Sequence, residues 1–232
     1  MKTLLCVMAH REAQATFDRH LGLWRAHGYP ILVMCPTDSP VQTGIQTVLV
    51  GKRGHHSDGA NARFRTFLKT LLDLEQYDSF FIHEYDSVCL CPKVPEVVLR
   101  NRYLWCNRFK NDFADPKFIG TQFLHPPFFM TREVIHAVLK TVGREAIEDH
   151  AEHNFYDRWL GLVADKACGT FLPQGYDRLG YSQNTILPAH MDEAKQAVRE
   201  GARFIHGVKT ETVLEGLLGA MFESKPHEAF AV

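Results

Sequence analysis

Two acidic residues, Glu84 and Asp86, follow directly after an apolar run at residues 80–82. A carboxylate that comes just after a buried parallel strand lies at the edge of the sheet, where Asp86 can hold a hard divalent cation. Mg²⁺ or Mn²⁺ in such a place bridges the phosphate oxygens of a nucleotide. The same spacing fits a β-turn, in which Asp and Ser are common, so the pair alone leaves both interpretations open.

A second polar pair, His206 and Lys209, follows the apolar residues Phe204 and Ile205 near the C-terminus. A histidine at the end of a strand can complete the ligand shell of a metal ion. A lysine three residues later can neutralise a diphosphate. Taken alone, His206 is also compatible with a structural histidine that is satisfied by hydrogen bonds.

The segment at residues 51–65 combines glycines with basic side chains. The residues concerned are Gly51, Gly54, Gly59, Lys52, Arg53, Arg63 and Arg65. Glycines permit close approach of the backbone to a ligand, and the basic residues suit a phosphate. The Walker pattern GxxxxGK[ST] is absent. The alternatives are a flexible surface loop and, through the pair His55 and His56, a metal site.

Glu148 and Asp149 stand at the start of a predicted helix over residues 148–167. Acids in a first helical turn are favoured by the helix dipole, which explains them without a function. A carboxylate at a rigid helix start can also act as a general base on an acceptor hydroxyl. His150 and His153 are further candidates, although the spacing HxxH is not the HExxH of a zinc protease.

An alternation of strands and helices must position these residues. In the first half, strands are predicted over 2–9, 30–35, 45–51 and 79–83, and helices over 11–28 and 60–76. This order predicts an α/β fold with a mostly parallel central sheet flanked by helices. Ligands bind beyond the carboxyl ends of such strands, so the polar clusters at 8–12, 35–39 and 83–87 are expected to converge on one edge.

The second half of the chain is less regular. Strands are predicted over 102–107, 118–124 and 202–210, and helices over 131–143, 148–167, 190–201 and 211–222, with Thr131 as an N-cap. Neither a repeat nor a linker interrupts the sequence, so we expect one domain over residues 1–232. Within it we distinguish a nucleotide-binding half (1–115), an acceptor half (116–220) and a tail (221–232).

The composition restricts the partners and the compartment. Lys and Arg number 26 and Asp and Glu 27, so a net charge of −1 gives no general attraction to nucleic acid or an anionic membrane. The first apolar run ends at residues 10–12 and is too short for a secretory signal, and no segment has the length of a membrane span. The six cysteines lie mostly in apolar runs, which favours a reducing cytoplasm.

The motifs, taken in order, resemble those of GT-A-type glycosyltransferases over about residues 1 to 220. The segments that carry the resemblance are NARF (61–64), YDSFFIHEYDS (77–87), ED (148–149) and HGVK (206–209). The resemblance implies a single GT-A-like, Rossmann-related domain. It also implies metal-dependent, inverting transfer of a sugar from a nucleotide diphosphate, most often UDP, to a hydroxyl of a carbohydrate or other acceptor. The DxD motif of the family reads Glu84-Tyr85-Asp86 here and departs from it in the first position.

The resemblance also implies a role for each candidate residue. Asp86 and His206 would bind Mn²⁺ or Mg²⁺, with Glu84 beside the metal or the sugar. The nucleotide-sugar would contact Ala9, His10, Arg11, Asp38, Asn61, Arg63 and Lys209. Asp149, with Glu148 next to it, would be the catalytic base. Pro126, Pro127, Phe128 and Phe129 would form an apolar wall for a sugar face.

Two other functions compete with this one. A sugar nucleotidyltransferase shares the sheet and the metal but usually carries a glycine-rich signature after its first strand, and residues 9–17 contain no glycine. A nucleotide-sugar-binding protein that kept the fold without catalysis is compatible with the variant acidic motif. A phosphatase of the DxDxT type is excluded, because the first strand ends in Ala9-His10.

Overall fold

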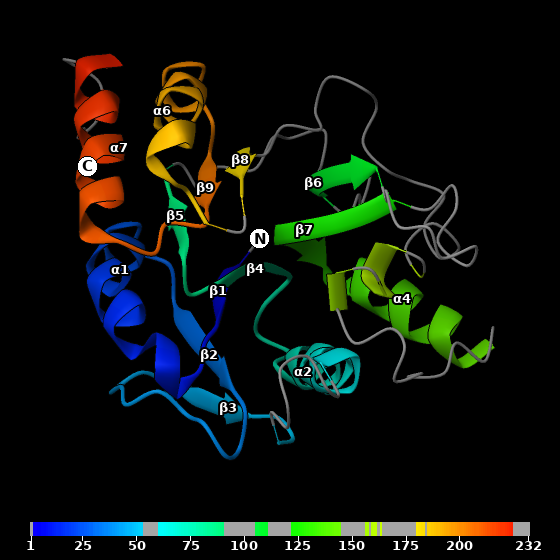
Figure 1. Ribbon diagram of the computed structural model, residues 1–232. Helices are drawn as coiled ribbons and strands as arrows, with labels where there is room; N and C mark the ends of the chain where they lie inside the picture. The colour runs from blue at the N-terminus through cyan, green and yellow to red at the C-terminus, as the bar shows by residue number, and fades with distance from the viewer. Residues whose placement is uncertain are drawn as a thin grey trace.

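The fold was determined from a computed structural model (Figure 1), which describes residues 2–52, 60–90, 105–110, 122–144, 156–157, 159–161, 163, 180–183 and 185–224. Residues 53–59, which include the His55–His56 pair, lie outside this part of the chain. So do Glu148 and Asp149, together with the last eight residues of the predicted tail.

A six-stranded sheet forms the centre of the molecule, with the strand order β3-β2-β1-β4-β7-β6. Its strands are β1 (Thr3–Met8), β2 (Ile31–Cys35), β3 (Thr47–Leu49), β4 (Ser79–Glu84), β6 (Trp105–Lys110) and β7 (Gln122–Thr131). The four strands β3, β2, β1 and β4 run parallel, whereas β7 is antiparallel to both β4 and β6. The predicted α/β fold with a mostly parallel central sheet is therefore confirmed.

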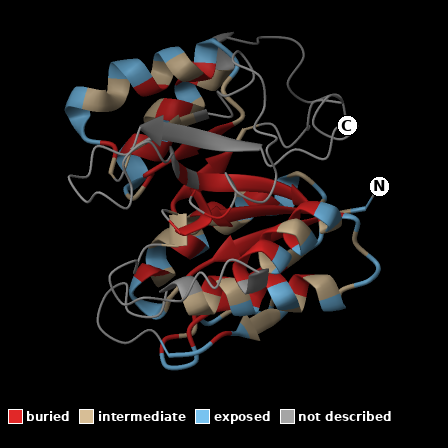
Figure 2. Ribbon diagram, turned by 90° about the vertical axis from the view of Figure 1, so that its right-hand side faces the viewer, coloured by how far each residue is buried: buried red, intermediate tan, exposed pale blue. Residues whose placement is uncertain are grey.

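Helices cover both faces of this sheet, which explains why successive residues of β1 from Leu4 to Met8 are all apolar. In β1, Leu4, Cys6 and Met8 face one core and Leu5 and Val7 face the other. The helices are α1 (Gln14–Ala26), after a short 3-10 turn η1 (Arg11–Ala13), α2 (Ala60–Asp73) and α4 (Arg132–Arg144). The first core is closed by α2 and α4 and the second by α1 (Figure 2).

A second, three-stranded sheet has the order β5-β9-β8. Its strands are β5 (Ser87–Cys89), β8 (Gly180–Ser182) and β9 (Phe204–His206), and the nearby helices are η4 (Pro188–His190), α6 (Met191–Arg199) and α7 (Glu211–Ser224). A third apolar cluster, which includes Ile205 and Leu217, joins this sheet to α6 and α7. The chain passes from the large sheet to the small one in the turn between β4 and β5, at residues 85–86.

Several local predictions can be compared with the structure. Thr131 caps α4 as expected, because its Oγ1 accepts a hydrogen bond of 3.4 Å from the Val134 N–H. Cys6 and Cys35 are buried free thiols, also as expected. Within the described residues, none of the helices combines the length and the apolar character that crossing a bilayer requires. The division into a nucleotide-binding half and an acceptor half stays a prediction.

The predicted apolar wall for a sugar is wrong. Phe128 and Phe129 are completely buried in β7 and pack into the two opposite cores of the large sheet. Pro126 and Pro127 belong to the same strand and are also buried. They occupy the place where the register between β6 and β7 shifts, which suits residues that have no N–H to donate to the ladder.

Candidate functional site

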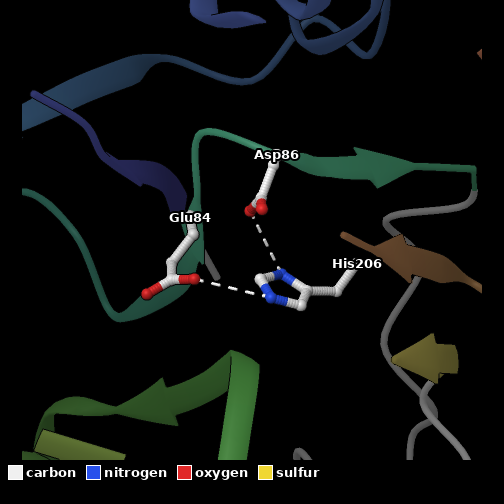
Figure 3. A group of neighbouring side chains, drawn as sticks. All are labelled: Glu84, Asp86 and His206. Carbon is white, nitrogen blue, oxygen red and sulfur yellow. Dashed lines mark ion pairs between the residues drawn. The ribbon is translucent and has the colours of Figure 1, made fainter. Parts of the chain in front are cut away.

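The candidate site lies where the two sheets meet, beyond the carboxyl end of β4 (Figure 3). Glu84 is the last residue of β4, and Asp86 lies in the turn before β5. β5 pairs with β9 in a register that places Ser87 opposite His206. Strand pairing, rather than proximity in sequence, therefore brings His206 to the two acids.

The three side chains point toward one another. His206 Nε2 lies 3.5 Å from Glu84 Oε2, and His206 Nδ1 lies 3.3 Å from Asp86 Oδ1. One ligand atom from each residue lies within 4.8 Å of the others. Neighbouring ligands of a six-coordinate Mg²⁺ or Mn²⁺ stand about 3 Å apart, given metal–oxygen distances of about 2.1 Å. Two carboxylates and an imidazole therefore fit such an ion in donor type, and one atom of each is close enough for the three residues to share a single ion.

The charge of the site also favours a cation. Asp86 and His206 are each only 2% exposed, and a buried carboxylate is costly unless it is paired. Lys209 provides one positive charge, with its Nζ 3.7 Å from Asp86 Oδ2. With His206 taken as neutral, the two carboxylates and the Lys209 ammonium together carry a net charge of −1. A divalent cation would reverse this balance and could then attract a diphosphate.

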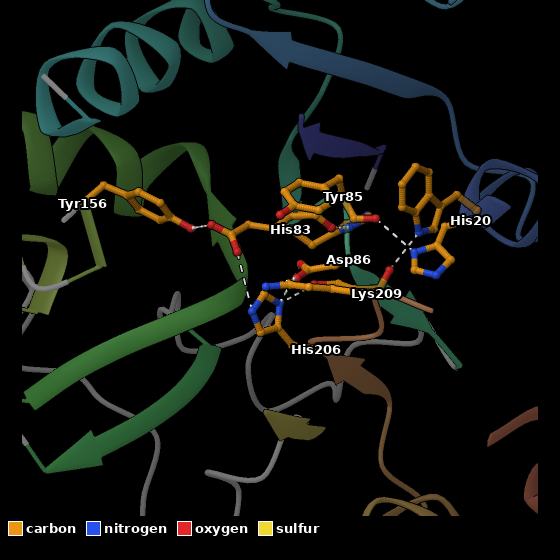
Figure 4. Close-up of polar contacts among 10 residues, drawn as sticks. His20, His83, Tyr85, Asp86, Tyr156, His206 and Lys209 are labelled. Atoms are coloured by element: carbon orange, nitrogen blue, oxygen red, sulfur yellow. Dashed lines mark hydrogen bonds and ion pairs between the residues drawn. The ribbon is translucent and has the colours of Figure 1, made fainter. Parts of the chain in front are cut away.

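Glu84 is oriented by a residue that the sequence did not indicate as functional. The Tyr156 hydroxyl donates a hydrogen bond to Glu84 Oε1 (Figure 4). The Tyr156 ring stacks on Phe64, with ring centroids 4.8 Å apart, and meets Phe128 edge-on. Burial, followed by the charge of Glu84, raises the pKa of Tyr156 well above its usual value, so the phenol stays protonated and donates. The only sequence signal was a tyrosine on an apolar helix face, where its hydroxyl needs a partner.

The strand ends that were predicted to bind a nucleotide lie at the same edge of the large sheet. Arg11 N–H donates to the Ser39 carbonyl at 2.9 Å, so the segment after β1 contacts the turn after β2 that contains Asp38. Tyr85 N–H donates to the Met8 carbonyl at 3.0 Å, which joins the acidic turn to the end of β1. The three polar clusters therefore converge as the topology predicted.

Four of the predicted nucleotide-sugar residues lie at this edge, namely Ala9, His10, Arg11 and Asp38. Ala9 is buried, with its N–H bonded to the Met34 carbonyl. His10 meets the Tyr85 ring edge-on at 5.1 Å, and its Nδ1 lies 2.7 Å from Glu12 Oε2. Arg11 and Asp38 are exposed.

The remaining candidates lie in or near α2, β9 and the undescribed segment at 145–155. Arg63 donates to the Lys52 carbonyl at 2.7 Å, which ties α2 to the end of the segment after β3. Asn61 is in the first turn of α2, but its side chain lies outside the described residues, as do Glu148 and Asp149 entirely. Ligand contacts for all these residues stay predictions.

Two buried histidines beside the site were also missed from the sequence. His83 Nδ1 donates to the Glu84 carbonyl at 3.0 Å, and His20 Nδ1 donates to the Tyr85 carbonyl at 2.9 Å. Burial lowers the pKa of each to about 4, so both are neutral at pH 7. They act on the backbone of the acidic turn rather than on a ligand.

Comparisons with known proteins define the fold further. No protein-family model matches the chain, and no curated protein matches it either. Among solved structures, the chain is similar to a glycosyltransferase involved in glycosylation of the major capsid of PBCV-1, with 14% identity and a TM-score of 0.52 over 94% of this chain and 100% of that one. The chain therefore has a glycosyltransferase fold, and the expected GT-A-like fold is confirmed.

A second solved structure, A197 from STIV, is more distant. It has 13% identity and a TM-score of 0.30 over 59% of this chain and 68% of that one. This similarity is too low to support an argument about the fold.

Proposed function

We propose that this protein is a metal-dependent glycosyltransferase. Its donor would be a nucleotide-diphosphate sugar, most simply a UDP-sugar, and its acceptor a hydroxyl of a carbohydrate or other molecule. The observation that carries the proposal is the convergence of Glu84, Asp86 and His206 at the carboxyl edge of the sheet in a glycosyltransferase fold. A cytoplasmic location belongs to the same proposal and rests on the sequence.

The residues divide into metal ligands and charges that act beside them. Asp86 and His206 would hold Mn²⁺ or Mg²⁺, with Glu84 as a further ligand or a hydrogen-bond acceptor. When bound, the ion supplies positive charge for the phosphate oxygens of the leaving nucleotide. Lys209, about one-third exposed and adjacent to Asp86, is placed to offset further charge on the same leaving group.

The transfer step itself requires a base. The proposed base is Asp149, with Glu148 next to it, and transfer with inversion would follow if this base deprotonates an acceptor on the face opposite the leaving group. This part of the proposal is supported by the sequence order of the motifs alone. It predicts that Asp149→Asn keeps donor binding and loses transfer, which a UDP-sugar binding assay run beside a transfer assay would measure.

The experiment that tests the metal site is a calorimetric titration with MnCl₂. We expect one Mn²⁺ per wild-type chain, and an affinity at least about 100-fold lower for Asp86→Asn, because an anionic ligand is lost. Asp73→Asn, an exposed acid at the end of α2, serves as the matched control and should bind Mn²⁺ like the wild type. Equal affinities in Asp86→Asn and Asp73→Asn would rule out the site.

The non-catalytic alternative predicts a different combination of results. Glu84, which replaces the usual first Asp of the motif, is engaged by Tyr156, so one oxygen of the variant acid is already occupied. If UDP-sugars with Mn²⁺ raise the melting temperature but are neither hydrolysed nor transferred, the protein is a binding module. Release of UDP in the presence of acceptors supports the transferase.

A further inference from the structure

Helix α1 and His27, the residue that follows it, direct a row of polar side chains toward the two chain segments that carry the candidate site. Each of four side chains donates a hydrogen bond to a backbone carbonyl in those segments. The pairs are His20 Nδ1 with Tyr85 (2.9 Å), Trp24 Nε1 with Ser87 (3.1 Å), His27 Nε2 with Cys89 (2.9 Å) and Arg19 Nη1 with Lys209 (3.1 Å). His20 and its partner Tyr85 are seen in Figure 4.

Two of these bonds satisfy carbonyls on the outer edge of β5, at Ser87 and Cys89, and a third satisfies Tyr85 in the turn before it. The inner edge pairs with β9 and its flanks, where Val208 N–H donates to the Asp86 carbonyl and Leu90 N–H to the Arg203 carbonyl. Carbonyls at alternate positions point to the opposite side, and a buried carbonyl without a donor costs about 1–3 kcal/mol. Helix α1 therefore takes the place of the neighbouring strand that β5 lacks on this side.

The spacing of donors along α1 matches the spacing of the carbonyls along residues 85–89. Two strand residues advance about 6.8 Å, and four helix residues advance about 6 Å. His20 and Trp24 can therefore reach the carbonyls at 85 and 87 in succession. Both side chains are completely buried, at positions where a helix that only packed against a core would carry aliphatic residues.

The second segment is attached to the same helix face. Arg19 and, at 3.5 Å, the Thr16 hydroxyl both donate to the carbonyl of Lys209. The Lys209 ammonium in turn contacts Asp86. One helix thus holds the backbone of residues 85–89 and of residue 209, between which the cluster of acids and His206 lies.

We infer that Arg19 and His20 are positioning residues of the candidate site. They fix the backbone at Lys209 and at Tyr85, and by doing so they keep Asp86, His206 and Lys209 in the arrangement that suits one cation. The inference depends on the proposed function for the presence of the cation. The fixing of the two segments does not depend on it.

The first measurement is hydrogen–deuterium exchange on the metal-free protein. In Arg19→Met, we expect amides in peptides covering 204–209 to exchange about tenfold faster, because local opening loses one hydrogen bond to a charged donor. Arg25→Met on the exposed side of the same helix is the control and should leave exchange unchanged. In His20→Leu the faster exchange should appear at 85–89, and His20→Asn should restore protection, because its amide nitrogen can stand where Nδ1 stood.

The second measurement is the affinity for MnCl₂ alone. We expect about tenfold weaker binding in Arg19→Met and His20→Leu, with His20→Asn close to wild type. Exchange in Arg19→Met equal to that in Arg25→Met would overturn the inference. If the wild-type protein binds no Mn²⁺, the proposed function is wrong. The exchange measurement alone then decides whether Arg19 and His20 fix the two segments. If His20→Leu does not fold, Arg19→Met, which alters a half-buried residue, decides the outcome.

Discussion

Gly207 provides the sharpest test of how the site is built. It follows His206 directly and has a φ of 91°, a backbone conformation that L-amino acids rarely adopt. A Cβ added at Gly207 would lie 2.2 Å from the Gln183 carbonyl oxygen and 3.1 Å from its carbon. Alanine at this position therefore meets both backbone strain and a collision with backbone atoms that cannot rotate away.

Gly201 distinguishes the cost of the backbone conformation from the cost of the collision. Its φ is 88°, close to that of Gly207, but a Cβ there would meet nothing within 4 Å. We expect Gly201→Ala to cost about 1–2 kcal/mol of unfolding free energy, which is the cost of the left-handed conformation. Gly207→Ala should cost about 3–4 kcal/mol, because the loop must also move away from Gln183.

The assay is urea denaturation of both variants and the wild type, together with titration of MnCl₂. Because residue 207 lies between His206, which ends β9, and Lys209, Gly207→Ala should also bind Mn²⁺ at least about tenfold more weakly than Gly201→Ala. If the two variants have equal free energies of unfolding and equal Mn²⁺ affinities, the close approach of residues 183 and 207 does not position the site, and the reasoning fails.

Three further predictions use other parts of the structure. Tyr156→Phe should lower Mn²⁺ affinity about tenfold with little effect on the melting temperature, because Glu84 loses the donor that orients it; unchanged affinity would exclude that role. Arg132 donates to the carbonyls of residues 72, 74 and 77, so Arg132→Met should reduce the free energy of unfolding by about 2–3 kcal/mol, measured in urea, whereas equal stability would show that water replaces it. His20 has a pKa of about 4 when folded and 6.5 when unfolded, so the unfolded chain binds more protons and stability falls as the pH drops from about 6.5 to 4. The contribution is about 1.4 kcal/mol per pH unit; denaturation at pH 7, 6 and 5 should show a shallower fall in His20→Asn, and parallel curves would contradict it.

The sequence predicted those strands that are unbroken runs of apolar residues. Residues 4–8 and 32–35 are buried on both faces, so they are apolar throughout and were predicted as parts of strands. The order of strands and helices then placed Asp86 at the carboxyl edge of the sheet. For His206 the prediction required the resemblance to a family, because a histidine after an apolar run has many possible roles.

What the sequence did not predict depends on contacts between distant segments. β5 and β8 have three residues each, too few for any periodicity, and they exist because β9 pairs with both. In α1 the structure buries Phe17, His20 and Trp24 and leaves Leu21 half-buried. A histidine stands at position 20 because the turn before β5 presents the Tyr85 carbonyl, which needs a donor, and no pattern within α1 encodes that need.

The spacing of Glu84 and Asp86 acquires a physical reason from the sheets. Glu84 is the last residue of β4, and Tyr85 and Asp86 form the turn that follows it. The acids face His206, while the Tyr85 ring turns toward His10 at the end of β1. The tripeptide therefore contacts both the candidate metal centre and the cluster predicted to bind the nucleotide. A ligand that contacts the His10 and Tyr85 rings would meet the same tripeptide that offers the two acids, so we expect nucleotide binding and metal binding to be coupled at this turn.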